Sequence, residues 1–80
     1  MPQPPLTPSD LGTLVRRVRK GQGLRQDQLA GVAGVGLRFI VDLEAGKPTI
    51  QLGKVLKVLE TLGCAVTITP PAGTEFGDGQ

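Results

Sequence analysis

The chain has 80 residues, nine of them basic and seven acidic, for a net charge of +2, with one cysteine and no histidine, Trp or Tyr. So short a chain forms one small domain at most. A lone cysteine without histidine excludes an internal disulfide, a zinc site and a Cys–His nucleophile pair, so we expect no enzyme, no metal and no cofactor. No apolar run approaches the roughly 20 residues that span a bilayer and no signal peptide is visible, which predicts a cytoplasmic protein.

Four prolines within the first eight residues predict a flexible N-terminal arm over residues 1–8. A first helix is expected from a cap at Thr7 or Ser9 to about Lys20, where two glycines end it. The basic residues of its last turns suit the helix dipole, and phosphate contact is a second interpretation of the same residues. Apolar residues at helical spacing predict that its core-facing stripe consists of Leu11, Leu14, Val15 and Val18.

Two short helical patterns follow, over Gln26–Ala33 and Leu37–Ala45, with a tight break between them. Gly34 in the break permits the positive φ that a sharp turn between helices often needs. In the second pattern, Ile40 and Leu43 are expected to point inward. Two helices of about eight residues joined by such a turn form a helix-turn-helix.

The opposite side of the second pattern is expected to face solvent. A recognition helix presents the exposed residues of its first turns to the major groove of DNA. There Arg38 can donate two hydrogen bonds to a guanine, and Leu37 can pack on a thymine methyl group. Asp42 would repel phosphate unless it accepts from a cytosine amino group or pairs with a neighbouring cation. The predicted base-reading residues are Leu37, Arg38, Val41 and Asp42.

Phosphate contacts are expected where the first of these two helices begins. Gln26 lies beside the free N–H groups of the helix N-terminus and can donate a further hydrogen bond to a phosphate oxygen. Arg25 occupies the cap position, where Ser or Thr would cap better, but it adds a cation that can face phosphate.

A helix over residues 51–62 comes next, with Thr49 expected as its cap and Gly63 as its end. Apolar residues occupy nearly all of its sides. Either this helix is central to the domain, or it presents a second apolar face to another subunit.

Residues 64–69 alternate in period two and predict a single β-strand. A solitary strand is unstable, so its edge should pair with the same strand of a second copy, with Val66 and Ile68 at the dimer contact. Residues 70–80 are rich in Gly and predict a disordered tail.

The positive charge is concentrated in the first part of the chain. Residues 1–47 hold seven basic and four acidic side chains, whereas residues 48–80 hold two basic and three acidic ones. The basic part coincides with the helix-turn-helix, which suits a polyanionic partner, and an ordinary solvated surface is the alternative interpretation.

The stretch QDQLAGVAGVG, with the later Ile and the sequence LEAGK, resembles the Xre/Cro class of helix-turn-helix DNA-binding domains. The resemblance implies an all-α, lambda-repressor-like bundle of four to five helices over residues 9–63, to which the C-terminal strand is added. The stretch LRFIVDLEAGKPT, followed by a helix rich in Leu and Val, the dipeptide LG and a short strand, is similar to HipB-like antitoxins. These are small repressors encoded beside a HipA-like kinase toxin.

The resemblance also implies roles for single residues. Gln26 matches a phosphate-clamping Gln, while Lys47 and Thr49 match the loop that holds the DNA backbone. Arg19 and Glu44 match a semi-buried ion pair. The sequence departs from the family pattern at Gly36 and Arg25, where hydroxyl residues are common. The predicted phosphate contacts are therefore Arg25, Gln26, Lys47 and Thr49.

The leading hypothesis is a homodimeric, sequence-specific repressor that binds a palindromic operator in double-stranded DNA and autoregulates its operon. By resemblance, it is the antitoxin of a type II toxin–antitoxin system, its partner is a HipA-like serine/threonine kinase toxin, and it acts at the nucleoid. One alternative is a stand-alone Xre-type repressor without a toxin. Another is a protein-interaction module of the same fold that binds no DNA, which the low net charge and Asp42 favour slightly.

Overall fold

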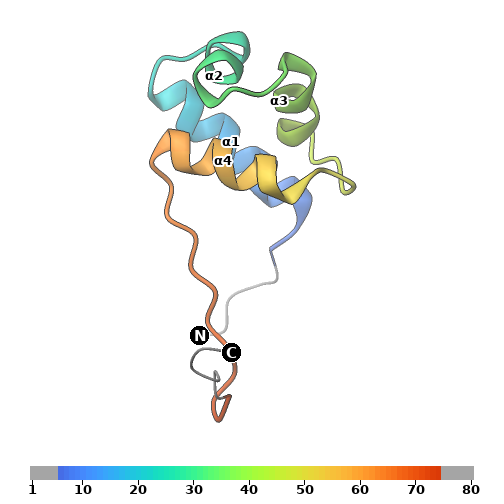
Figure 1. Cartoon of the computed structure of the whole chain (residues 1–80), viewed down its shortest axis with the longest axis vertical. Helices are drawn as coiled ribbons and strands as arrows, with labels where there is room; N and C mark the ends of the chain where they lie inside the picture. The colour runs from blue at the N-terminus through green and yellow to red at the C-terminus, as the bar shows by residue number, and fades with distance from the viewer. Residues whose placement is uncertain (1–5, 75–80) are drawn as a thin grey trace.

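The computed structural model describes residues 6–74, so the first part of the predicted arm and the last part of the predicted tail lie outside the described residues. The described chain contains the four helices α1 (Pro8–Gly21), α2 (Gln26–Ala33), α3 (Leu37–Glu44) and α4 (Leu52–Leu62). Helices α1 and α4 lie together at the base of the bundle, with α2 and α3 above them (Figure 1). The prediction of an all-α bundle of four to five helices is confirmed with four, none of which is long and apolar enough to cross a bilayer.

Helix α1 is capped by Thr7, the first of the two predicted candidates. The Thr7 hydroxyl accepts a hydrogen bond from the backbone N–H of Asp10 at 3.0 Å, and the Asp10 carboxylate accepts one from the N–H of Thr7 at 3.2 Å. This reciprocal capping box satisfies two N–H groups that lack partners within the helix. Pro8, assigned by the sequence to the arm, is the first residue of the helix, a position where its missing N–H costs nothing.

The buried side of α1 differs from the predicted stripe. Val15 is fully buried, and Leu11 and Val18 pack partly against the core, but Leu14 is 45% exposed. The prediction for Leu14 was wrong because α1 turns Gly12 toward α3, and this rotation carries Leu14 away from the core.

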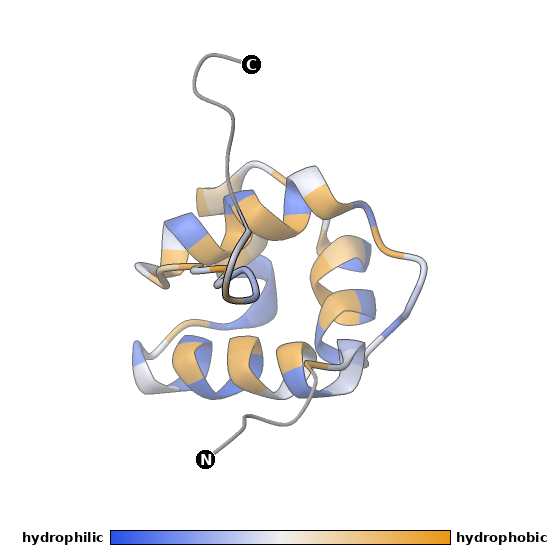
Figure 2. Cartoon of the chain, turned by 90° about the horizontal axis from the view of Figure 1, so that it is seen from below, coloured by the Kyte–Doolittle hydropathy of each residue, from blue (hydrophilic) through white to orange (hydrophobic). Residues whose placement is uncertain are grey.

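The core is aliphatic, as the composition requires. Figure 2 shows apolar and polar residues alternating along the helices, as expected for helices that each bury one side. The half-buried Phe39 packs against the edge of the core without entering it. The buried residues of the core come from all four helices and are Val15, Leu29, Ala30, Ala33, Ile40, Leu43, Val55, Val58, Leu59 and Leu62.

The start of α4 was predicted incorrectly. Its N-cap is Gln51 and not Thr49, because the chain stays extended through Gln51 while the half-buried Ile50 packs against the core. Helix α4 packs into the core and also has a second apolar face, while contact of that face with another subunit stays a prediction. One face contributes to the core, and the other leaves Leu52 and Leu56 exposed to solvent.

The segment after α4 is extended but is not a strand, and residues 6–74 contain no β-strand. The predicted strand needs a partner backbone, which this single chain does not supply. The segment leaves the bundle beyond Gly63 and runs away from it (Figure 1), with Val66 exposed and Ile68 87% exposed.

Candidate nucleic-acid interface

Helices α2 and α3 form the helix-turn-helix unit, and its geometry is fixed by packing beneath it. Leu29 of α2 and Ile40 of α3 are both fully buried. Gly34 ends α2 with φ +72°, in the left-handed conformation that the sharp turn was predicted to need. Gly36 caps α3 without a side-chain hydrogen bond, so core packing rather than capping holds the first turn of α3 in place.

The first turn of α3 presents two of the predicted base-reading residues to solvent. Leu37 is exposed, and the side chain of Arg38 is 84% exposed. Val41 and Asp42, one turn further on, are half-buried. The ring of Phe39 faces α4, where the Lys54 ammonium lies 5.9 Å from the ring centroid. The exposed tip of α3 therefore combines an apolar side chain with a guanidinium group, a pair suited to base edges in a major groove.

Asp42 joins this tip to the loop after α3. One of its carboxylate oxygens lies 3.2 Å from Arg38 Nε, and the other lies 3.6 Å from Lys47 Nζ. The backbone N–H of Lys47 also donates to the backbone carbonyl of Asp42 at 3.0 Å, which holds the loop close to the helix. The Asp42 side chain is 21% exposed, whereas both cations are largely in solvent. Three of the predicted DNA-contacting residues thus form one cluster.

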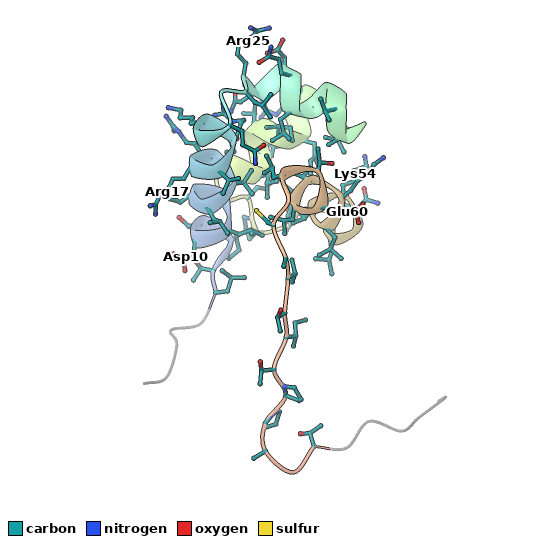
Figure 3. All side chains as sticks on the ribbon, turned by 90° about the vertical axis from the view of Figure 1, so that its left-hand side faces the viewer. Asp10, Arg17, Arg25, Lys54 and Glu60 are labelled. Carbon is teal, nitrogen blue, oxygen red and sulfur yellow. The ribbon has the colours of Figure 1, made fainter. Side chains whose placement is uncertain are left out.

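The start of α2 holds two predicted phosphate contacts. Arg25 lies 3.0 Å from the Asp27 carboxylate, and the hydrogen bond from Arg25 lowers the pKa of Asp27 below its ordinary value. The Gln28 side chain accepts a hydrogen bond from the backbone N–H of Arg25 at 2.8 Å, so Gln28 fixes the entry to the helix. Figure 3 shows Arg25 at the end of the molecule opposite to the C-terminal segment.

A buried charge network ties Gln26 to the rest of the domain. Arg19 forms a two-pronged pair with Glu44, at 2.6 Å and 2.9 Å, and also donates to the backbone carbonyl of Leu24 at 2.8 Å. The same carboxylate accepts a hydrogen bond from Gln26 Nε2 at 3.1 Å. The hydrogen bond to Glu44 raises the pKa of Arg19 above its ordinary value. The ion pair that the family resemblance implied is present, and it also orients the predicted phosphate clamp.

The sequence leaves phosphate contact open for the basic residues of the first helix, and the structure brings two of them to this surface. An open concavity of about 520 Å³ lies beside Gln26 and Arg25, and Arg16 and Lys20 of α1 line it as well. Their spacing of four residues places them on one side of α1. The concavity therefore combines cations from α1 with the start of α2. The remaining predicted phosphate contact, Thr49, is exposed in the loop between α3 and α4.

Comparisons with known proteins agree with this geometry. The profile of the family HTH_3, described as Helix-turn-helix, matches residues 15–68. The chain is 75% identical over 65 residues to the uncharacterized HTH-type transcriptional regulator y4mF of Sinorhizobium fredii (strain NBRC 101917 / NGR234), a match that covers 81% of this chain and 86% of that protein. The structure is similar to chains from a HipA-HipB-O2-O3 complex and from a HipB-O4 20mer complex, each with TM-score 0.75, 25% identity, and coverage of 85% of this chain and 96% of the other.

Proposed function

We propose that this chain, which belongs to the HTH_3 family of Xre-type helix-turn-helix transcriptional regulators, is a homodimeric repressor. It would bind a palindromic operator in double-stranded DNA. The observation that carries the proposal is the exposed tip of α3, where Leu37 and Arg38 face solvent above a buried support. A guanidinium group there can donate two hydrogen bonds to a guanine, and the leucine can cover a thymine methyl group. Val41 and Asp42 lie behind them on the same helix.

The backbone of the operator would be held on both sides of this tip. Arg25 and Gln26 at the start of α2 supply a cation and an amide donor beside free N–H groups. Lys47 and Thr49 in the loop after α3 supply a cation and a hydroxyl donor. Such contacts position the duplex without reading its sequence, and they make binding depend steeply on salt.

The dimer is proposed to form through the C-terminal half. Val66 and Ile68 expose apolar side chains on an extended segment, and Leu52 and Leu56 leave an apolar face on α4. If the C-terminal segments of two copies paired as strands, their backbone groups would be hydrogen-bonded and the side chains of Val66 and Ile68 would be covered. A two-fold dimer would place the two recognition helices on half-sites one or two helical turns apart, with about 34–36 Å per turn.

The antitoxin role rests on the similar structures. One of them contains HipA together with HipB, and 85% of this chain has the fold of a chain in that complex. We extend this to a HipA-like serine/threonine kinase toxin as the partner of this protein in the cytoplasm, at the nucleoid. A gene neighbourhood without a kinase-like gene would favour the stand-alone repressor instead.

The proposed function is tested by titrating the purified protein against DNA from its own upstream region at two salt concentrations, beside a scrambled duplex of the same length. We expect tight binding to the upstream duplex only, weakening steeply as salt rises. Binding to neither duplex would leave the fold intact and favour the protein-interaction module.

Arg38→Ala is expected to weaken binding to the upstream duplex by about 1–3 kcal/mol and to relax the preference at one base pair. The reason is the loss of a two-bond contact to a base edge. The matched control is Arg17→Ala, which removes an exposed cation from α1, a helix without any predicted base-reading residue, and should leave the base preferences unchanged. Titration of both variants against duplexes with single base-pair substitutions measures the base preferences. Arg38 does not read a base if Arg38→Ala keeps the base preferences of the wild type.

Ile68→Pro is expected to shift the protein from dimer to monomer in sedimentation velocity. Proline cannot donate to a strand ladder, so the proposed pairing of the C-terminal segments would be interrupted. The folded bundle should persist, since Ile68 lies outside the core. If the protein stays a dimer after this change, the dimer contact is made by the exposed face of α4. Leu56→Gln would then be expected to dissociate the dimer.

A further inference from the structure

We propose that Asp42 is a specificity-determining residue of the DNA-binding surface, which directs Arg38 toward a base edge and weakens the attraction of Arg38 and Lys47 for phosphate without preventing the backbone contact of Lys47. The inference rests on the proposed repressor function. It is carried by the two ion pairs that the Asp42 carboxylate makes, one with a predicted base-reading cation and one with a predicted backbone-contacting cation.

The atoms that form the pairs matter. Arg38 approaches Asp42 most closely through Nε, at 3.2 Å, and its two terminal nitrogens donate no hydrogen bond to another group within residues 6–74. A guanidinium group has five N–H donors in a rigid planar fork, so the terminal donors can contact guanine O6 and N7 while Nε stays paired. The carboxylate is the better-fixed partner, because its side chain is 21% exposed and that of Arg38 is 84% exposed. The Asp42 carboxylate therefore orients the more exposed Arg38 side chain toward the base edge.

The same carboxylate also limits contacts to DNA phosphates, which carry no sequence information. It lies 3.6 Å from Lys47 Nζ, on a loop held to α3 by a backbone hydrogen bond from Lys47 to Asp42. Two cations and one carboxylate leave this cluster with a net charge of +1 rather than +2. Phosphate attraction supplies most non-specific affinity, so a carboxylate in this place weakens binding to arbitrary DNA.

A direct contact from Asp42 to a cytosine amino group is the competing role. It would require Asp42 to leave both cations and approach the bases itself. The two roles differ in their dependence on Arg38. The proposed effect on the ratio of specific to non-specific affinity acts through Arg38, because release of Lys47 raises the affinity for both duplexes alike, whereas the direct contact does not need Arg38.

The test compares Asp42→Asn with the wild type on the upstream duplex and on the scrambled duplex. Asn keeps the shape of the side chain and removes its charge. We expect affinity for the scrambled duplex to rise about five- to tenfold and its salt dependence to steepen by about one phosphate equivalent. Affinity for the upstream duplex should stay level or fall slightly, so the ratio of the two affinities falls about tenfold. The control Glu60→Gln removes one exposed carboxylate from α4 and should leave that ratio unchanged.

The double variant Arg38→Ala with Asp42→Asn separates the two roles. We expect its ratio of affinities to equal that of Arg38→Ala alone. An Asp42→Asn effect on the ratio of affinities that persists without Arg38, or one confined to a loss of operator affinity, would replace the proposal with the direct base contact. A wild type that discriminates between the duplexes while Asp42→Asn keeps the same ratio would overturn this proposal alone. A wild type that binds neither duplex would overturn the repressor function and this proposal with it.

Discussion

Glu44→Ala is expected to lower the free energy of unfolding by about 3–5 kcal/mol, because it leaves the Arg19 guanidinium buried without its counter-charge. The side chains of Arg19 and Glu44 are only 8% and 5% exposed, so both charges of the pair lie out of solvent. After the change, Arg19 would keep only its hydrogen bond to the backbone carbonyl of Leu24. A chain of this length is stable by about 4–12 kcal/mol, so the expected loss is between about a quarter and all of the total.

Urea titrations followed by far-UV circular dichroism measure this effect. Glu60→Ala is the matched control, since it truncates an exposed glutamate and should change stability by no more than about 0.5 kcal/mol. Replacing both partners, with Arg19→Met and Glu44→Leu, should recover most of the loss, because no unpaired charge then remains in the interior. A Glu44→Ala protein as stable as Glu60→Ala would mean that water reaches Arg19 and that the pair contributes little.

The network also predicts an effect on DNA binding that stability alone does not explain. Gln26 donates to the same Glu44 carboxylate, so the double variant should fold and yet hold Gln26 less firmly. Weaker binding with an unchanged salt dependence, as expected when a neutral donor to phosphate is lost, would support Gln26 as a phosphate contact.

Gly12→Ala is expected to lower the free energy of unfolding by about 1–3 kcal/mol, through overpacking between α1 and α3. A Cβ atom at Gly12 would lie 2.5 Å from the carbonyl oxygen of Leu43 and 2.7 Å from that of Glu44. Both are backbone atoms at the end of α3, so no flexible side chain can move aside. The two helices would have to separate, which would also disturb the Arg19–Glu44 pair.

Gly31→Ala provides the control with the opposite sign. Gly31 lies inside α2, and a Cβ atom there would meet no atom within 4 Å. Ala is the better helix former, so this variant should be more stable than the wild type by about 0.5–1 kcal/mol. Thermal unfolding of both variants checks the pair of predictions. Stabilisation by Gly12→Ala as well would show that α1 and α3 move apart at little cost.

Local signals in the sequence were sufficient for the helix-turn-helix itself. The spacing of apolar residues and the left-handed Gly34 fixed α2 at Gln26–Ala33, and placed Ile40 and Leu43 in the core. These features depend on contacts between residues three or four positions apart and on one backbone conformation, which a sequence displays directly. Residues matched through the family resemblance added the pairing of Arg19 with Glu44, which no local pattern indicates.

Other features were decided only when the helices met. The burial of Gly12 in place of Leu14 depends on how closely α1 approaches α3, and the late start of α4 depends on the packing of Ile50. The attachment of Gln26 to Glu44 joins the start of one helix to the end of the next. The C-terminal segment is the clearest case, because its alternation in period two describes one edge of a ladder and pairing requires a second backbone. The sequence by itself therefore determined the helices, the turn and most of the core, since these follow from local conformational preference and hydrophobic spacing. Which side of α1 faces α3, and how Gln26 at the start of α2 is joined to Glu44 at the end of α3, was decided by the tertiary structure, because these depend on distances between segments that the order of residues does not contain.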